Sequence, residues 1–217
     1  MKGNDKSVTQ VSLLNKIEKR EAVVGIIGLG YVGLPLAIHF GHQGFKVIGF
    51  DVDVRKIDML LRGESYIKHI QMEQIGEKIK AGKLDVTVDF NRLSEADCIL
   101  ICVPPPLTDK KEPDLSYVMD TTNCIADNLR AGQIVILEST TYPGTTEEAL
   151  LPRLETNDMK AGEDFFLAYS PEREDPGNKK FDAANIPKVV GGVTSACLEI
   201  ASALYNCITK VVPVSST

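Results

Sequence analysis

The chain has 217 residues, 43% of them hydrophobic, and a formal net charge of −6 at pH 7. This length fits one large domain or two small ones, and the apolar content is sufficient for a sizeable core. The acidic balance gives no electrostatic reason to expect nucleic acid or an anionic membrane as a partner. A small anionic ligand stays compatible with it, because a local group of backbone amides can hold a phosphate.

The cysteines predict reduced thiols in a cytoplasmic protein. Their number is odd, they stand in apolar segments and none forms a C-x-x-C pair. They are Cys98, Cys102, Cys124, Cys197 and Cys207. The N-terminus lacks a secretory apolar segment, and no stretch approaches the roughly 18 apolar residues of a membrane span. We therefore expect a cytoplasmic protein without a membrane partner.

Apolar runs alternate with helical patterns along the whole chain, as in a parallel sheet with crossover helices. Residues 1–21 predict a short amphipathic helix in an N-terminal extension. Strands are expected at about 23–27, 46–51, 84–88, 98–103, 134–138, 165–169, 186–192 and 209–214. Helices are expected near 31–43, 54–62, 71–81, 115–129, 145–156 and 194–207. The predicted fold over residues 22–217 is a Rossmann-like α/β domain, doubly wound, with a mainly parallel sheet and helices on both faces.

The last residues, "VVPVSST", end on Ser215, Ser216 and Thr217. These residue types commonly cap the N-terminus of a helix, and nothing follows them to be capped. We interpret the chain as truncated, with a natural polar tail as the alternative.

The stretch "VVGIIGLGYVGLP" places Gly28, Gly30 and Gly33 between a predicted strand and a predicted helix. Gly28 permits a tight turn, Gly30 lets the backbone approach a pyrophosphate, and Gly33 lets the helix pack closely on the strand. Free amides at the start of the helix, together with its dipole, favour an anion. The alternative for these glycines alone is a purely structural turn.

Asp51 ends the second predicted strand, 18 residues after Gly33. A carboxylate there can accept hydrogen bonds from the adenosine ribose and would repel a 2′-phosphate, so NAD is favoured over NADP. Arg55 lies close by in the sequence and keeps NADP open, although it could equally stack on the adenine. Strand, glycines, helix and acid together predict a dinucleotide site.

Three polar segments follow the fourth, fifth and sixth predicted strands. They are "ICVPPPL", with Pro104, Pro105 and Pro106; "LESTTYPGTT", with Glu138, Ser139, Thr140 and Thr141; and "AYSPEREDPGN", with Ser170, Glu172, Arg173, Glu174 and Asp175. The carboxyl ends of parallel strands share one edge, where ligands bind. Each segment has a structural alternative: stiffening prolines, a helix cap at Thr145 or Thr146, or a solvated charged face. Together they predict a site that holds a polar substrate against a nicotinamide.

These segments resemble the UDP-glucose/GDP-mannose dehydrogenase family, the nucleotide-sugar 6-dehydrogenases. The matching pieces are "GIIGLGYVGLPLA", "GFDVD", "LRGES", "CVPPPL" with "PDLSYV", "ESTTYPGTT", "YSPERE" and "IPKVVGG". They follow the family order over roughly residues 22–214. The forms "ESTTYPGTT" and "SPEREDPGN" look most like the branch that acts on UDP-N-acetylglucosamine, with UDP-glucose and UDP-N-acetylmannosamine as the alternatives.

The resemblance implies oxidation of a sugar C6 alcohol to a carboxylate with two NAD, through an enzyme-bound thiohemiacetal and thioester. It implies that the amides of Tyr31 and Val32 contact the pyrophosphate. It implies that Val103, Pro104, Pro105 and Ser139 lie beside the cofactor. Thr140 would lie there too and help to place a catalytic water. Glu172 would assist thioester hydrolysis, and Glu174 is the candidate for the motif's second glutamate, although the motif is shorter here.

Two departures from the family pattern stand out. Pro105 replaces a threonine that can bond the cofactor, which removes one hydrogen bond worth roughly 0.5–1.5 kcal/mol. The family's "K-x-x-x-N" helix and glycine-rich catalytic cysteine segment lie beyond Thr217, with the dimerising central helix and the domain that closes on UDP. We expect the chain to bind NAD without turning over a UDP-sugar, and the full-length protein to be a homo-oligomer. No residue is assigned to a metal.

Two rival interpretations remain. The chain could be a non-catalytic module that senses NAD or docks a partner, but such a module would not need the retained "STT" and "SPE" residues. It could also be a related NAD(P) enzyme acting on hydroxy acids, for which no basic anchor for a carboxylate stands out.

Overall fold

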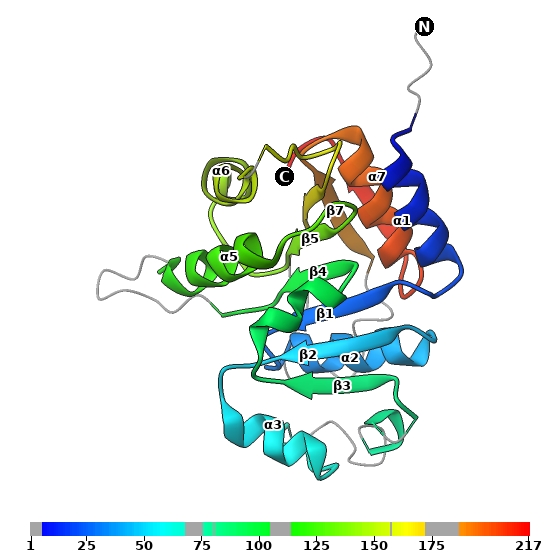
Figure 1. Cartoon of the computed structure of the whole chain (residues 1–217), viewed down its shortest axis with the longest axis vertical. Coiled ribbons are helices and arrows are strands. Elements are labelled where there is room, and N and C mark those ends of the chain that lie inside the picture. Colours follow the sequence, from blue (N-terminus) through cyan, green and yellow to red (C-terminus); the bar gives the residue numbers. More distant parts are fainter. Residues whose placement is uncertain (1–5, 68–75, 80, 105–113, 157, 172–186) are drawn as a thin grey trace, which may run out of the picture.

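A computed structural model of the chain describes residues 6–67, 76–79, 81–104, 114–156, 158–171 and 187–217. Its centre is an eight-stranded sheet with the strand order β3-β2-β1-β4-β5-β6-β7-β8 (Figure 1). The strands are β1 (Val23–Ile27), β2 (Lys46–Phe50), β3 (Leu84–Thr87), β4 (Cys98–Ile101), β5 (Ile134–Leu137), β6 (Phe166–Tyr169), β7 (Lys188–Gly192) and β8 (Val211–Val214).

Helices connect most of these strands. They are α1 (Val8–Glu18), α2 (Gly33–His42), α3 (Val54–Leu61), α5 (Ser116–Asn128), α6 (Leu151–Leu154) and α7 (Ser195–Tyr205). A 3₁₀ segment, η1 (Phe90–Glu95), precedes β4, and a π-helical segment, η2 (Thr145–Leu150), runs directly into α6. The side chains of Ser7, Asp53 and Thr194 cap α1, α3 and α7 by accepting a backbone N–H, which fixes where these helices begin.

The sheet is parallel from β3 through β6, in the strand order of a dinucleotide-binding fold. Strand β7 then pairs antiparallel with β6, and β8 pairs parallel with β7. The start of β7 therefore lies at the same edge of the sheet as the carboxyl ends of β5 and β6. The predicted Rossmann-like, mainly parallel α/β fold is confirmed.

Alternating side chains of the strands divide the core into two layers. In β4, Cys98 and Leu100 face the layer that contains residues of α1, α2 and α7. Ile99 and Ile101 face the other layer, which contains residues of η1, α5 and α6. Because both faces are covered, the strands are continuously apolar, as is usual for a buried parallel sheet.

Helix α1 confirms the helix expected within residues 1–21, and it lies beside α7 (Figure 1). Its buried side chains Leu13 and Ile17 belong to the same core layer as α7. Lys16 of α1 also forms an ion pair of 2.8 Å with Asp97, which directly precedes β4. The helix is thus attached to the amino-terminal edge of the sheet.

The structure differs from the expected elements in a few places. Segment η1 was not predicted, because six residues of 3₁₀ helix carry no clear periodicity. The helix expected at 71–81 is described only at 76–79, which are helical. The helix expected at 145–156 begins as the π-helical η2. Among the residues that the structure describes, no helix has the length and apolar character needed to span a bilayer.

Candidate functional site

The turn after β1 is closely packed, and two of its glycines have no room for a side chain. Gly28 has a φ of 92°, and its N–H donates to Phe50 O at 2.8 Å. A Cβ on Gly28 would lie 2.7 Å from Cys102 O, and a Cβ on Gly33 would lie 1.9 Å from Gly28 O. Both glycines are therefore required by the backbone itself, since neither neighbouring atom is a movable side chain.

Gly30 differs, because a Cβ there would meet nothing within 4 Å. Gly30, Tyr31 and Val32 border a cavity of about 470 Å³ at the carboxyl edge of the sheet. Helix α2 begins directly after them, and its N-cap Val32 supplies no side-chain hydrogen bond. The first-turn amides of an uncapped helix form a favourable site for an anion, and Gly30 leaves open space beside them.

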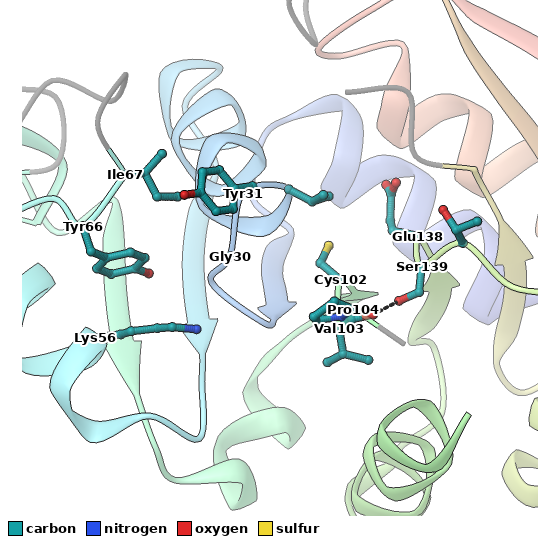
Figure 2. A pocket seen from close by; sticks show the side chains of 12 residues that line it. Gly30, Tyr31, Lys56, Tyr66, Ile67, Cys102, Val103, Pro104, Glu138 and Ser139 are labelled. Atoms are coloured by element: carbon teal, nitrogen blue, oxygen red, sulfur yellow. Dashed lines mark hydrogen bonds between the residues drawn. The ribbon is translucent and has the colours of Figure 1, made fainter. Parts of the chain in front are cut away.

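The cavity extends to both sides of the glycine turn. Figure 2 shows Lys56 and Tyr66 at one end and Glu138 and Ser139 at the other, with Gly30 between them. The complete lining is Gly30, Tyr31, Val32, Lys56, Tyr66, Ile67, Cys102, Val103, Pro104, Glu138, Ser139 and Thr140. An elongated cavity with an anion site at its middle matches a dinucleotide, whose pyrophosphate lies between two nucleosides.

Asp51 lies just behind this cavity and does not line it. Its carboxylate is only 5% exposed and accepts hydrogen bonds from Leu29 N–H at 2.9 Å, Asp53 N–H at 2.9 Å and Lys56 Nζ at 2.8 Å. Asp51 thus attaches the glycine turn to the end of β2 and directs Lys56 to the cavity wall. The motif pattern predicts Asp51 but not Lys56, five residues further on, whose only signal in the sequence is its closeness to Asp51.

Arg55, by contrast, is on the surface. Its side chain is 89% exposed, its guanidinium pairs with Asp53 at 2.9 Å, and it is not among the cavity residues. This hydrogen-bonded pair lowers the pKa of Asp53. The structure therefore places the cation of this segment that faces the cavity at Lys56 and not at Arg55.

Tyr66 lies at the Lys56 end of the cavity and contacts the glycine turn. Its hydroxyl donates to Leu29 O, and Lys56 Nζ lies 5.8 Å from the centre of its ring. Burial, and next the charge of Asp51, raise the pKa of Tyr66, so the phenol remains a neutral donor at physiological pH. Tyr66 follows the "LRGES" segment directly and was also missed, because a single tyrosine after a turn carries no distinguishing pattern.

The other end of the cavity brings together residues of two strand ends, as predicted. Ser139 Oγ donates to Val103 O at 2.6 Å, and Glu138 N–H donates to Ile101 O at 3.0 Å. Pro104 and Thr140 line the cavity beside them. Pro105 lies outside the described residues.

The predicted carboxylates Glu172 and Glu174 also lie outside the described residues. Ser170, directly after β6, donates its backbone N–H to Leu137 O at 3.0 Å, so Ser170 itself lies beside the end of β5. Within the described ranges, no group of three or more His, Cys, Asp or Glu side chains could hold a metal ion.

A sheet in this strand order, a glycine turn at its first strand–helix junction and an elongated cavity at its carboxyl edge define a dinucleotide-binding Rossmann domain. Residues 22–209 match the UDP-glucose/GDP-mannose dehydrogenase family, NAD binding domain. The chain belongs to this family, and its cofactor is NAD. The cavity fits that group, because Gly30 leaves space beside uncapped helix amides and the cavity continues to both sides of the glycine turn.

Relatives of known activity agree with this assignment. The chain is 37% identical over 188 residues to UDP-N-acetyl-D-glucosamine 6-dehydrogenase of Pseudomonas aeruginosa, covering 86% of this chain and 44% of that protein. It is 33% identical to UDP-N-acetyl-D-mannosamine dehydrogenase of Pyrococcus horikoshii, covering 86% and 45%. The structure of NDP-N-acetyl-D-galactosaminuronic acid dehydrogenase from Methanosarcina mazei superimposes with a TM-score of 0.83 at 36% identity, covering 94% and 47%. The chain therefore spans less than half the length of these relatives.

Proposed function

We propose that this chain is the NAD-binding part of a nucleotide-sugar 6-dehydrogenase, which oxidises the C6 alcohol of a UDP-sugar to a carboxylate with two NAD. The observation that carries the proposal is the continuous cavity from Lys56 past the glycine turn to Ser139 and Thr140. A module that only bound the cofactor would not need the Thr140 hydroxyl, which can orient a water beside the nicotinamide. The substrate that we propose first is UDP-N-acetylglucosamine, on the strength of the Pseudomonas relative. UDP-N-acetylmannosamine and UDP-glucose are the alternatives.

The site residues divide between the two ends of the cavity. The amides beside Gly30, at Tyr31 and Val32, would hold the pyrophosphate. Asp51 and Lys56 would hold the adenosine ribose, with Asp51 acting from just behind the wall. Val103, Pro104, Ser139 and Thr140 would flank the nicotinamide, since it must lie on the opposite side of the glycine turn from the ribose. Bound there, NAD supplies the hydride acceptor.

For the chemistry beside the nicotinamide we assign roles to three side chains. The Thr140 hydroxyl can donate and accept a hydrogen bond at the same time, which suits it to orient a water. Glu172 supplies a carboxylate that can accept a proton from such a water during thioester hydrolysis, and Glu174 is the candidate for a second. Both follow Ser170 closely, and Ser170 is hydrogen-bonded to the end of β5.

None of the five cysteines is proposed as the nucleophile of the thioester chemistry. A nucleophilic cysteine needs a stabilised thiolate, whereas burial raises the pKa of Cys98 and of Cys207. Cys102 is buried at the end of β4, Cys197 is buried in α7 and Cys124 is on the exposed side of α5. We therefore propose that the chain by itself binds NAD and does not oxidise a UDP-sugar. We also propose a cytoplasmic location and a homo-oligomeric full-length protein.

Calorimetric titration tests the cofactor assignment. NAD should bind, and Asp51→Asn should weaken its binding by about tenfold, because the substitution removes the charge that orients Lys56 and holds the glycine turn from behind the ribose end. Asp97→Asn is the matched control, since Asp97 is also a buried carboxylate beside a lysine but lies at the opposite edge of the sheet. Unchanged NAD affinity in Asp51→Asn would remove the ribose assignment. Steady NADH formation from UDP-N-acetylglucosamine by the chain alone would contradict the proposal on turnover.

A further inference from the structure

A buried ionic cluster borders the nicotinamide end of the cavity through Glu138. It consists of Glu138, Lys188 and Tyr205, and we call it the Glu138 cluster. The Glu138 side chain is fully buried, and Lys188 Nζ donates to its Oε2 at 2.6 Å. The Tyr205 hydroxyl donates to its Oε1, and Lys188 Nζ also lies 5.1 Å from the centre of the Tyr205 ring. Both carboxylate oxygens of Glu138 are thus engaged.

The three residues come from different parts of the chain and meet at one edge of the sheet. Glu138 directly follows β5, Lys188 is the first residue of β7, and Tyr205 is the last residue of α7. Strand β6 lies between β5 and β7, so the Glu138–Lys188 pair bridges the carboxyl end of β6. Ser170, next to that end, is buried, and its Oγ has no hydrogen-bond partner in the described part of the chain.

Stability alone does not explain this arrangement. Removing two charges from water is costly, and an ion pair in a core is commonly no more stabilising than apolar side chains of the same volume. Tyr205 belongs to an apolar core layer that also contains Cys197, Ile200 and Leu204 of α7. What an ion pair adds to such a core is a fixed relative orientation of the elements that carry the two charges.

The orientation that this pair fixes concerns the nicotinamide end. Glu138 is followed immediately by Ser139 and Thr140, which line the cavity. The backbone of the same short stretch is held on its other side by the bonds from Glu138 N–H to Ile101 O and from Ser139 Oγ to Val103 O. The Glu138 cluster therefore holds one side of this stretch, and the end of β4 holds the other.

We infer that Glu138, Lys188 and Tyr205 are positioning residues that hold Ser139 and Thr140 in the geometry that receives the nicotinamide. Lys188 and Tyr205 do not line the cavity and act through Glu138, which borders the cavity and directly precedes Ser139 and Thr140. The inference rests on the proposed function, because it assumes that the nicotinamide lies at this end of the cavity. Loosening the cluster should weaken binding of the nicotinamide half of NAD and leave binding of the ADP-ribose half intact.

Calorimetry with two ligands separates these effects. ADP-ribose lacks the nicotinamide, so the ratio of its Kd to that of NAD measures the nicotinamide contribution alone. In the double variant Glu138→Gln/Lys188→Met, which removes both charges together, this ratio should fall by about fivefold while the Kd of ADP-ribose stays within about twofold. Tyr205→Phe, which removes one hydroxyl and should fold, should reduce the ratio by about twofold. Lys188→Arg keeps the positive charge, so its ratio of the ADP-ribose Kd to the NAD Kd should stay close to that of the unsubstituted chain.

The matched control is Asp97→Asn/Lys16→Met, which removes a comparable ion pair at the amino-terminal edge. It should lower the melting temperature without changing either Kd. An unchanged ratio in both Glu138-cluster variants, with both ligands still bound, would overturn the positioning role alone. A ratio near one in the unsubstituted chain would overturn it as well. Failure of the unsubstituted chain to bind either ligand would instead overturn the proposed function.

Discussion

Two buried aspartates at opposite edges of the sheet show how one local chemistry serves two purposes. Asp51 follows β2 at the carboxyl edge and accepts hydrogen bonds from two backbone amides and Lys56. Asp97 precedes β4 at the amino edge and accepts hydrogen bonds from Val23 N–H, Lys16 and Arg130. Each carboxylate is nearly inaccessible, and each is compensated by backbone amide and cation together.

The surroundings of the two carboxylates differ. Asp51 holds the glycine turn and a lysine that lines the 470 Å³ cavity. Asp97 lies beside a smaller cavity of about 200 Å³ and attaches α1 and the end of the α5–β5 connection to the sheet. In a parallel sheet ligands bind at the carboxyl edge. We therefore expect the Asp51–Lys56 pair to support cofactor binding, whereas the Asp97–Lys16 pair holds α1 against the sheet.

The largest expected effect on stability comes from a substitution at Gly33, in the turn at the carboxyl edge of the sheet. Gly33→Ala would place a methyl group against Gly28 O, a backbone atom that cannot move aside, and should lower the free energy of unfolding by about 3 kcal/mol or more. Gly30→Ala is the matched control, because its methyl group meets open space and should leave stability unchanged while it weakens NAD binding. Urea denaturation and NAD titration measure both. Equal stability of the two variants would contradict the packing described here.

Asp97→Ala should remove the hydrogen bonds that Asp97 accepts at the amino-terminal edge of the sheet and leave the cofactor cavity unchanged. We expect a loss of about 2 kcal/mol in unfolding free energy, because Val23 N–H loses its acceptor while the partly exposed Lys16 and Arg130 remain hydrated. The Kd for NAD should stay within about twofold of the unsubstituted value, since less than 0.5 kcal/mol reaches the other edge. A tenfold rise in that Kd would show that the two edges of the sheet are coupled, and it would contradict the separation of binding at the carboxyl edge from packing at the amino edge.

The pH dependence of stability tests the role of the Asp97 carboxylate at the amino-terminal edge. Burial by itself would raise the pKa of Asp97, but hydrogen bonds from Lys16, Val23 N–H and Arg130 outweigh it, and the pKa lies below its ordinary value. A carboxyl whose pKa is lower in the native state stabilises the fold above its unfolded pKa, about 3.9, and loses that contribution as the pH falls through the native pKa. Urea midpoints between pH 2.5 and 7 should therefore fall at the acid end. Asp97→Asn should reduce that fall, and an identical acid limb in the variant would contradict the assignment.

Arg55→Ala should have the smallest effect. Its guanidinium pairs with Asp53 at the surface, where solvent screens the two charges. We expect the urea midpoint to stay unchanged and the NAD Kd to change by less than about threefold. Lys56→Met is the matched comparison, because Lys56 lines the cavity and should matter more for binding. A larger binding loss in Arg55→Ala than in Lys56→Met would restore Arg55 as a cofactor residue.

Much of the fold could be predicted because its signals are local. Apolar runs and helical spacing placed nearly all strands and helices within a few residues, and the glycine spacing placed the turn between β1 and α2. Gly28 and Gly33 could be named in advance, because a tight strand–helix turn has the same steric requirement wherever it occurs. The six-residue η1 was missed, because so short a helix produces no repeating pattern.

The class of domain, its family and the cofactor edge can be predicted from the chain alone, because each depends on motifs contained within a few consecutive residues. That Lys56 and not Arg55 faces the cavity is visible only in the folded chain, because one helical position changes which side of α3 a cation occupies. The hydrogen bonds of Glu138 to Lys188, 50 residues away, and to Tyr205, 67 residues away, are likewise visible only in the folded chain. Such contacts depend on which strands become neighbours in the sheet. A local sequence pattern does not specify which residues so far apart in the chain will meet.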